Sequence, residues 1–476
     1  MPSSATSDTP AARATSERVT AIVARVSRRV AGRIEEPLSF ARAFAETQVG
    51  PRRIGRTARH RANTGVSPHR SCVASSATIC EHVTRLCAQR LSADDILHLR
   101  MNQGPGSPLD PCWRLWKVSR LILDGLRCPI VQAPMAGGPS TPALAAAVSG
   151  AGGLGFLAAG YRTVDEVERE LAEVRSLVPP GVPYGLGLFA PPGHGAGATG
   201  ISSYADRLQD EAERRDVALG EPQWDDDWYS EKLDLLGELP VPVVSLTFGC
   251  PTPSQVDQLH ASGSAVWVTV TTVEEARAAQ RAGADALIVQ GMEAGGHRGG
   301  FDDTHPGDIG LLALLQLVQA AVDDDLPLVA AGGLITGGGI AAVLAGGAAA
   351  AQLGTAFMLC PEAGTVPAHR DVISRGDAPT ALTRAFTGRT ARGITNRFLQ
   401  DHADAPSAYP EIHHLTGPLR AAARTQGETD GFQLWAGQAY ALAQPLPAAD
   451  LVVRLTTEAR EALKLATRRT SGHASR

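Results

Sequence analysis

The sequence ALIVQGMEAGGHRGG, at residues 286–300, joins a short apolar run to a glycine-rich loop that carries one histidine. The run at residues 286–291 has the length and the aliphatic composition of a buried strand. Four of the eight residues from Glu293 to Gly300 are glycines, which leave space for a ligand beside the backbone. The stretch therefore predicts a strand that delivers His297 and its loop to one end of a sheet.

Outward from this stretch, the same alternation of an apolar run with a helical segment repeats over residues 121–400. The other predicted strands lie at residues 129–135, 154–159, 184–189, 241–249, 265–270, 327–333 and 351–359. Thr163 lies three residues before Glu166, a spacing that predicts a helix start, and Thr271 and Glu274 repeat it. Eight such units predict an α/β fold, the (β/α)8 or TIM barrel. A doubly wound open sheet is the alternative, but no GxGxxG motif comes directly after the first predicted strand, where residues 136–141 read AGGPST.

Several segments lie outside this repeat. Residues 190–228 form an insertion after the third predicted strand, with WDDDW near its end. Residues 401–465 are predicted to form a helical region that packs on the barrel, followed by a polar tail at 466–476. Residues 1–120 contain 19 Lys and Arg against 9 Asp and Glu, and we expect them to form a basic, disordered N-terminal extension. A targeting segment or a nucleic-acid-binding tail is the alternative for this extension.

The composition argues against several classes of protein. The net charge of −5 is small for 476 residues and aromatic residues make up only 5%, so no nucleic-acid partner is expected. No run of 18 apolar residues occurs, so no transmembrane helix or membrane partner is expected. The seven cysteines show no zinc or redox spacing, which favours free thiols in a reducing compartment and a cytoplasmic protein. Cys360 is expected to be a buried, inert thiol rather than a nucleophile, and the oligomeric state stays open.

Glycines at the ends of the last two predicted strands indicate a phosphate site. Gly333 ends the seventh strand, three glycines at residues 337–339 open the next helix, and QLGT at residues 352–355 belongs to the eighth strand. Barrels often bind phosphate with these two loops, where backbone N–H groups and a helix N-terminus face the anion. Glycines that only permit tight strand-to-helix turns are the alternative.

The phosphate can belong to a substrate or to a cofactor, and two features favour FMN. Ala133, Pro134 and Met135 end the first strand as an apolar platform that suits the flat face of an isoalloxazine ring. Gln290, at the end of the sixth strand, offers an amide that can both donate to and accept from the polar edge of that ring. We therefore expect FMN at the barrel mouth.

His297 is the predicted catalytic residue. Barrel enzymes keep their chemistry at the carboxyl ends of the strands, and imidazole can take a proton from a carbon acid near neutral pH. Arg298 next to it can stabilise an anion or pair at the surface. Glu411, His413 and His414 lack a further metal ligand at a suitable spacing, so no metal site is expected.

Several motifs in order make the chain similar to the nitronate monooxygenase family, formerly called 2-nitropropane dioxygenases, over about residues 122–445. They are PIVQAPMAGGPSTPALAAAVSGAGGLGFL, QGMEAGGHRG, LVAAGGL followed by AQLGTAF, FTGRTARGITNRF, YPEIHHLTGPLR and LWAGQAY. The resemblance implies FMN-dependent oxidation of nitronates or nitroalkanes by O2 to carbonyl compounds and nitrite, with His297 as the base. It also implies FMN contacts from Ala133, Pro134, Met135, Gln290, Gly295, Gly333, Gln352, Leu353, Gly354 and Thr355.

One position departs from the family. The family usually has Asn in a strand-three motif like GVNLF, whereas this chain reads GLGLF with Gly187 at the Asn position. A side-chain hydrogen bond to the flavin is then lost or supplied by water, which leaves the substrate less defined than the cofactor. The leading alternative function is an FMN-dependent NAD(P)H oxidoreductase of the same fold, such as an enoyl-thioester or quinone reductase. A phosphate-substrate isomerase or lyase on the same barrel is the second alternative.

Overall fold

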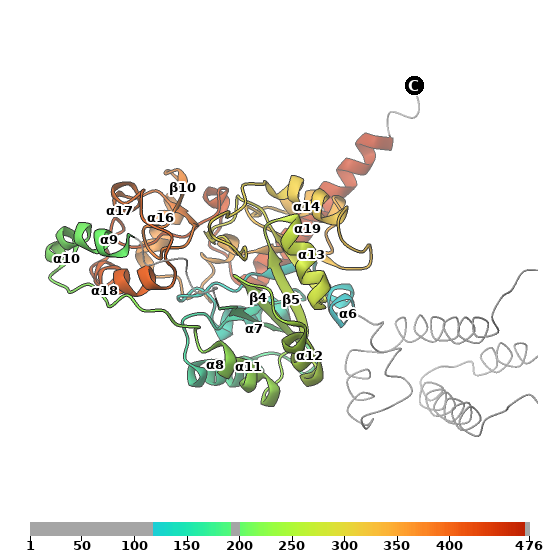
Figure 1. Cartoon of the computed structure of the whole chain (residues 1–476). Helices are drawn as coiled ribbons and strands as arrows, with labels where there is room; N and C mark the ends of the chain where they lie inside the picture. Colours follow the sequence, from blue (N-terminus) through green and yellow to red (C-terminus); the bar gives the residue numbers. More distant parts are fainter. Residues whose placement is uncertain (1–117, 192–199, 472–476) are drawn as a thin grey trace, which may run out of the picture. The chain divides into compact units, whose positions relative to one another are not determined.

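A computed structural model describes residues 118–191 and 200–471, and eight parallel strands form its centre (Figure 1). The strands are β1 (Ile130–Gln132), β2 (Phe156–Ala158), β3 (Gly185–Phe189), β4 (Val243–Thr247), β5 (Ala265–Val270), β6 (Ala286–Gln290), β8 (Leu328–Ala331) and β9 (Ala350–Leu353). Their order in the sheet is β1-β9-β8-β6-β5-β4-β3-β2, and a parallel bridge between Val131 and Leu154 joins its two ends. The predicted TIM barrel is confirmed.

Helices connect successive strands, as the alternation predicts. They are α7 (Pro142–Gly150), α8 (Val164–Leu177), α11 (Tyr229–Glu238), α12 (Pro253–Ser262), α13 (Val273–Ala282), α14 (Leu311–Gln319) and α15 (Gly337–Ala345). The capping box of Thr163 and Glu166 is confirmed at the start of α8. The second box lies one residue later than predicted, at Thr272 and Glu275, and the Glu275 carboxylate also accepts the N–H of Thr271.

The strands bury side chains on both faces. One cluster of buried side chains comes mainly from alternate residues of the strands, and it includes Val131, Phe156, Trp267, Ile288 and Val329. The other large cluster lies between the strands and the surrounding helices. The eighth strand is shorter than predicted, because the chain turns after Gly354 into the 3-10 helix η1 (Thr355–Phe357).

The insertion after β3 packs with the C-terminal region. It contains α9 (Ile201–Arg207) and α10 (Gln209–Arg215), whose apolar side chains belong to a separate core. This core includes Ile201, Tyr204, Leu208, Phe386, Phe398, Ile412 and Leu415. The Tyr204 hydroxyl donates to the carbonyl of Ala385 (2.6 Å). The insertion and the C-terminal region therefore form one packed layer beside the barrel.

A buried ion-pair network strengthens this layer. The Glu211 carboxylate on α10 binds Arg215 on the same helix and Arg397 at the start of α17 (Arg397–Asp401). Burial alone would raise the pKa of Glu211, but hydrogen bonds from Arg397 and Arg215 lower it to about 2. The carboxylate is therefore ionised at neutral pH and holds the two segments together.

The region after residue 360 contains helices on both sides of residue 401, where the predicted helical region begins, and also a small sheet that was not predicted. The helices are α16 (Pro367–Arg375), α17, α18 (Glu411–Gln426) and α19 (Ala448–Ser471), with a 3-10 helix η2 (Tyr440–Leu442). Strands β10 (Thr380–Thr383) and β11 (Ala391–Ile394) form an antiparallel sheet with β7 (Gly296–His297). The C-terminal region therefore pairs directly with the histidine loop.

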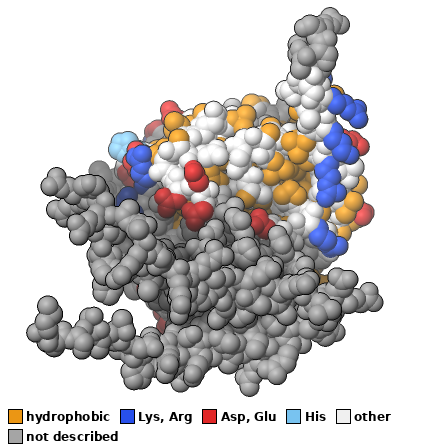
Figure 2. Space-filling view, turned by 90° about the vertical axis from the view of Figure 1, so that its right-hand side faces the viewer, with side chains coloured by type: hydrophobic (Ala, Val, Ile, Leu, Met, Phe, Trp, Pro, Cys, Tyr) orange, Lys and Arg blue, Asp and Glu red, His pale blue; other side chains and the backbone are white. Residues whose placement is uncertain are grey.

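Helix α19 packs on α15 and α7, and its last turns are largely exposed. Figure 1 shows the C-terminal part of α19 projecting away from the barrel, and its exposed basic residues are Arg460, Lys464, Arg468 and Arg469. Figure 2 shows a column of basic side chains at one edge of the molecule. No helix among the described residues is both long and apolar enough to cross a membrane.

The ends of the chain are only partly described. Helix α6 (Val118–Gly125) begins within the last residues of the predicted N-terminal extension. The rest of that extension, residues 192–199 of the insertion and residues 472–476 of the predicted tail lie outside the described residues.

Candidate active site

His297 lies on β7, the two-residue strand that follows β6 in the chain. It pairs with Ala391 of β11, and Gly296 beside it pairs with Arg392. Gly296 has a φ of 72°, a left-handed conformation that glycine adopts without strain. Backbone pairing therefore holds the predicted catalytic residue, and the glycine before it provides the turn that reaches the small sheet.

Aromatic side chains surround the His297 ring. The ring centroids of Trp435, Phe248 and Tyr409 lie 5.5, 5.6 and 6.0 Å from that of His297. Nε2 of His297 lies 2.9 Å from the hydroxyl of Thr387. The other ring nitrogen, Nδ1, makes no hydrogen bond to a described residue. The half-buried imidazole is therefore oriented by one hydroxyl and enclosed by an aromatic wall made of Phe248, Tyr409 and Trp435.

The His297 ring is neutral at physiological pH. Burial lowers the pKa of this imidazole to about 3, and the guanidinium groups of Arg389 and Arg420 add to the effect. Arg389 lies over the ring of Phe248, with its guanidinium carbon 4.1 Å from the ring centroid. A neutral imidazole has a lone pair that can accept a proton, and the two cations favour an anion left by that transfer.

Gln290 and Arg298 fix the backbone of the histidine loop. Gln290 Oε1 accepts hydrogen bonds from the N–H of Gly299 (2.9 Å) and from Arg298 (3.1 Å). Gln290 Nε2 donates to the carbonyl of His297 (3.2 Å). Arg298 is 1% exposed and also donates to the carbonyl of Gly291 (2.6 Å). The prediction for Arg298 is corrected: it clamps its own loop instead of pairing at the surface. Gln290 keeps only its second amide N–H for a cofactor.

Predicted cofactor residues from three loops meet at Gly437, in the segment after β11. The N–H of Gly437 donates to the hydroxyl of Thr355 (3.0 Å). A methyl group added at Gly437 would lie 3.7 Å from Cα of Gly333. A methyl group added at Gly295 would lie 2.4 Å from the nitrogen of Gly437, so this close approach needs glycine. The fold thus brings Gly295, Gly333 and Thr355 together.

The predicted residues of the first and eighth strands also lie side by side. The N–H of Ala133 donates to the carbonyl of Leu353 (2.9 Å). A methyl group added at Gly354 would lie 3.5 Å from Sδ of Met135 and 3.7 Å from Cβ of Ala133. Gln352 is buried, and its Oε1 has no hydrogen-bond partner among the described residues. A buried, unpaired carbonyl oxygen is costly, which indicates a site for a ligand donor.

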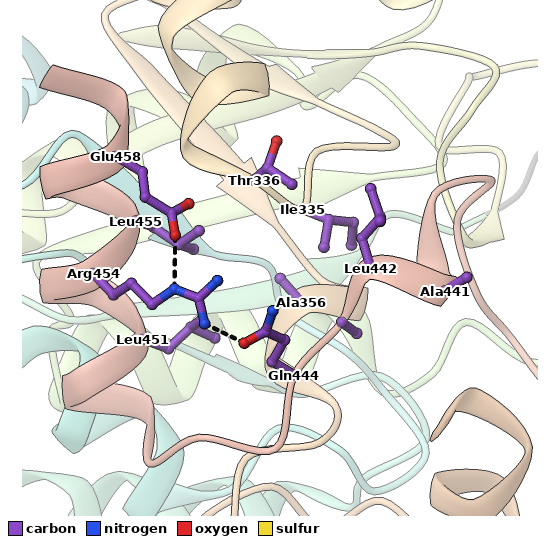
Figure 3. A pocket seen from close by; sticks show the side chains of 11 residues that line it. Ile335, Thr336, Ala356, Ala441, Leu442, Gln444, Leu451, Arg454, Leu455 and Glu458 are labelled. Atoms are coloured by element: carbon purple, nitrogen blue, oxygen red, sulfur yellow. Dashed lines mark hydrogen bonds and ion pairs between the residues drawn. The ribbon is translucent and has the colours of Figure 1, made fainter. Parts of the chain in front are cut away.

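The glycines at residues 337–339 serve helix packing. The N–H of Gly337 donates to the carboxylate of Glu458 on α19 (3.2 Å), and that of Gly339 donates to the hydroxyl of Thr336 (3.2 Å). A methyl group added at Gly337 would lie 2.2 Å from Cβ of Glu458. Figure 3 shows Glu458 and Thr336 in the pocket of about 210 Å³ that these segments line. Glu458 and Thr336 thus take two of the N–H groups at the start of α15, so the end of β9 at Gly354 and Thr355 is the better candidate for the predicted phosphate.

Pro134 occupies the space beside Gly187, the position at which the chain departs from the family motif. A methyl group added at Gly187 would lie 2.5 Å from Cβ of Pro134 and 3.4 Å from Oγ of Ser245. Ser245 is fully buried, and its hydroxyl has no partner among the described residues. The glycine is therefore matched to the position of Pro134, the predicted flavin platform.

The histidines at residues 413–414 and the thiol of Cys360 have structural surroundings. Among the described residues, no group of three or more His, Cys, Asp and Glu side chains is placed to hold a metal ion. His414 binds Asp225 (2.5 Å), whereas the ring of His413 stacks on Tyr161 with centroids 4.2 Å apart. Burial raises the pKa of the Cys360 thiol to about 12, so this side chain is protonated and inert.

No local sequence pattern predicts a role for the residues that enclose His297. Phe248 follows β4 with a φ of 80°, which no local pattern predicts. Thr387, Tyr409 and Trp435 lie in the motifs FTGRTARG, YPEIHH and LWAGQ. These motifs lie outside the predicted strands, and each combines polar with aromatic residues. That combination is the sequence signal that could have indicated the residues around His297.

Comparisons with known proteins place the chain in a family. The family model described as nitronate monooxygenase matches residues 121–458. A nitronate monooxygenase of Pseudomonas aeruginosa is 42% identical over 359 residues, covering 72% of this chain and 99% of that protein. The crystal structure of a nitroalkane oxidase from Streptomyces ansochromogenes is 49% identical, with a TM-score of 0.69 over 72% of this chain and 99% of that chain. FabK from Thermotoga maritima is 26% identical, with a TM-score of 0.57 over 73% of this chain and 97% of that chain.

Proposed function

Because the chain belongs to the nitronate monooxygenase family, it is an oxidoreductase, and we propose that it oxidises alkyl nitronates or nitroalkanes with O2 to carbonyl compounds and nitrite, using bound FMN. The likeness to a nitronate monooxygenase and to a nitroalkane oxidase supports this reaction. In this chain the proposal depends on one observation above all. His297, in the motif QGMEAGGH, is a neutral, half-buried imidazole oriented by Thr387 inside an aromatic wall.

The residues at the barrel mouth fit FMN. The unpaired Oε1 of Gln352 needs a donor and the second N–H of Gln290 needs an acceptor, and the edge of an isoalloxazine ring offers both. Glycines from three loops border the site without side chains, and the end of β9 at Gly354 and Thr355 is the assigned phosphate contact. We assign FMN binding to Ala133, Pro134, Met135, Gln290, Gly295, Gly333, Gln352, Leu353, Gly354 and Thr355.

His297 is assigned the proton transfer that a neutral nitroalkane requires. Its free ring nitrogen accepts the proton from the carbon next to the nitro group, which leaves a nitronate anion and an imidazolium. Because the pKa of His297 is low, this transfer goes forward only where the nitronate is stabilised, and the imidazolium then releases its proton to solvent. Arg389 and Arg420 favour the anion. A substrate supplied as the nitronate needs no base, and bound FMN supplies the one-electron oxidation of the nitronate and the reduction of O2.

The variant His297→Asn tests this assignment in the FMN-loaded enzyme. We expect FMN to stay bound, the oxidation of a neutral nitroalkane to fall about 10²–10⁴-fold, and the oxidation of the preformed nitronate to persist. His305→Asn is the matched control, because the side chain of His305 is 90% exposed on a loop. Full activity of His297→Asn on the neutral nitroalkane would show that the base assignment is wrong.

The same preparation separates the alternative functions. FMN that is bleached by NAD(P)H without oxygen, together with no reaction towards nitronates, would favour an NAD(P)H oxidoreductase. The likeness to FabK at 26% identity keeps that alternative open to this test. A purified protein without flavin absorbance would contradict the FMN assignment. The scattered free thiols support a reducing, cytoplasmic location, which fractionation of the source cells would test.

A further inference from the structure

Helix α18 carries a buried cation that has no counter-ion among the described residues. Arg420 on α18 is 5% exposed, and no described carboxylate lies within ion-pair distance of it. Its guanidinium contacts neutral groups: it donates to the hydroxyl of Thr416 (3.0 Å) and to the carbonyl of His413 (2.7 Å), and it lies 3.3 Å from Nδ1 of the same histidine. Burial lowers the pKa of Arg420 to about 10, so the side chain remains charged at neutral pH. Burying an uncompensated charge costs free energy, which a bound anion would offset.

Two phenol groups link this cation to His297. The hydroxyl groups of Tyr409 and Tyr161 lie 3.4 Å apart, and the Tyr409 ring lies 6.0 Å from that of His297. The Tyr161 ring stacks on His413, whose carbonyl binds Arg420. Burial raises the pKa of both phenols, to about 12 for Tyr161, so both keep their protons at neutral pH. Their mutual hydrogen bond uses one proton and leaves the other for a ligand.

The inserted segment holds Tyr161 in position. Tyr161 has a φ of 65°, which is rare for a residue other than glycine. Its N–H donates to the carboxylate of Asp227 (2.8 Å), the last aspartate of WDDDW. Asp227 pairs with the buried Lys232 (2.8 Å), which also donates to the carbonyl of Ala159 (2.9 Å). Asp227 and Lys232 neutralise each other, so the pair fixes Tyr161 without supplying a counter-charge to the cation on α18.

We propose that the hydroxyl group of Tyr161, held in place by the hydrogen bond from Tyr409 and backed by the charge of Arg420, recognises the O–N–O end of the substrate anion and of the nitrite product. The identity of the anion rests on the function proposed above. Protonated phenols donate short hydrogen bonds to anionic oxygens, and a buried guanidinium strengthens the binding of an anion more than that of a neutral molecule. Arg420 therefore sets the preference for a nitronate over the neutral nitroalkane with the same carbon skeleton.

Calorimetric titration of the FMN-loaded enzyme with sodium nitrite tests this site without relying on turnover. We expect Arg420→Met to weaken nitrite binding at least tenfold and to raise the KM for a nitronate with a much smaller change in kcat. Arg420→Lys, which keeps the charge, should lose less than Arg420→Met. Arg375→Met is the control, because this arginine has a 55% exposed side chain on α16, and it should bind nitrite like the parent.

Two phenylalanine variants keep the test decisive if Arg420→Met does not fold. Tyr161→Phe and Tyr409→Phe each remove one hydroxyl and should each weaken nitrite binding at least threefold. Nitrite affinity within twofold of the parent in every folded variant of the three residues would overturn the inference. If the parent binds nitrite through these residues yet does not oxidise nitronates, the anion site stands and the proposed reaction fails. If the parent oxidises nitronates while these variants bind nitrite with unchanged affinity, the proposed reaction stands and the anion site fails.

Discussion

Replacing Gly187 on β3 by Asn, the usual residue in the nitronate monooxygenase family, is expected to destabilise this chain. Any side chain at this position places its Cβ 2.5 Å from Cβ and 2.6 Å from Cγ of Pro134. Carbon atoms pack favourably at about 3.5–4.0 Å, so one of the two segments has to move by about 1 Å. Strand β3 is paired on both sides, with β2 and β4. The loop that carries Pro134, the proposed flavin platform, is therefore the part that gives way.

The expected loss of stability follows from this overlap. Extra carbon atoms in a packed site cost about 1–3 kcal/mol, and we expect about 2 kcal/mol for Gly187→Ala. Gly187→Asn should reach at least about 3 kcal/mol, because it also buries an amide near a single hydroxyl, that of Ser245. At about 2–4 °C per kcal/mol, these losses correspond to a fall in Tm of roughly 4–12 °C. FMN affinity should fall in the same order, because the displaced loop carries the platform.

Urea denaturation of the FMN-free protein measures the stability, and FMN fluorescence measures the affinity. Gly237→Ala on α11 is the matched control, because a methyl group there meets no atom within 4 Å. In an exposed helix alanine is favoured over glycine, so the control should match or exceed the parent by about 0.5–1 kcal/mol. Pro134→Ala in the Gly187→Ala background should recover at least about 1 kcal/mol relative to additivity. Parent-like stability and FMN affinity of both Gly187 variants would refute the packing argument.

Four further substitutions test the packing of the fold and the proposed phosphate contact. Glu211→Gln should cost about 3 kcal/mol at neutral pH, because it leaves the buried Arg215 poorly compensated. The pKa of Glu211 falls from 4.5 to about 2 on folding, so the stability that its carboxylate adds is complete above about pH 4.5 and is lost as the pH falls towards 2. Denaturation measured over a series of acid pH values checks this, and a stability difference between parent and variant that does not shrink would contradict it. Glu458→Gln should lower the free energy of unfolding by about 1 kcal/mol and leave the Kd for FMN unchanged. Thr355→Ala should raise the Kd for FMN at least tenfold. A raised Kd in Glu458→Gln and an unchanged Kd in Thr355→Ala would place the phosphate at α15. Tyr204→Phe should cost about 1 kcal/mol in urea titrations through the lost hydrogen bond to the C-terminal layer, and an unchanged midpoint would mean that this bond adds nothing.

Local patterns in the sequence were sufficient to predict the barrel. Its strands are buried on both faces, so each appears in the sequence as a continuous apolar run. Helix starts are marked by capping residues such as Thr163, whose capping box spans only four residues. The histidine loop was equally visible, because glycine pairs on both sides of His297 follow a predicted strand. These signals are short-range, and each acts within one strand, turn or helix end.

The tertiary structure alone decided which polar groups are free. Glu458 occupies the glycine-rich start of α15 from 121 positions away, and Thr387 orients His297 from 90 positions away. The Gln290 side chain makes three hydrogen bonds to its own loop. Pro134 fills the space beside Gly187. Each outcome depends on which distant side chain occupies a given donor, acceptor or space in the folded structure. No periodicity records such contacts, so the sequence located the site and the packing determined what each of its residues can still bind.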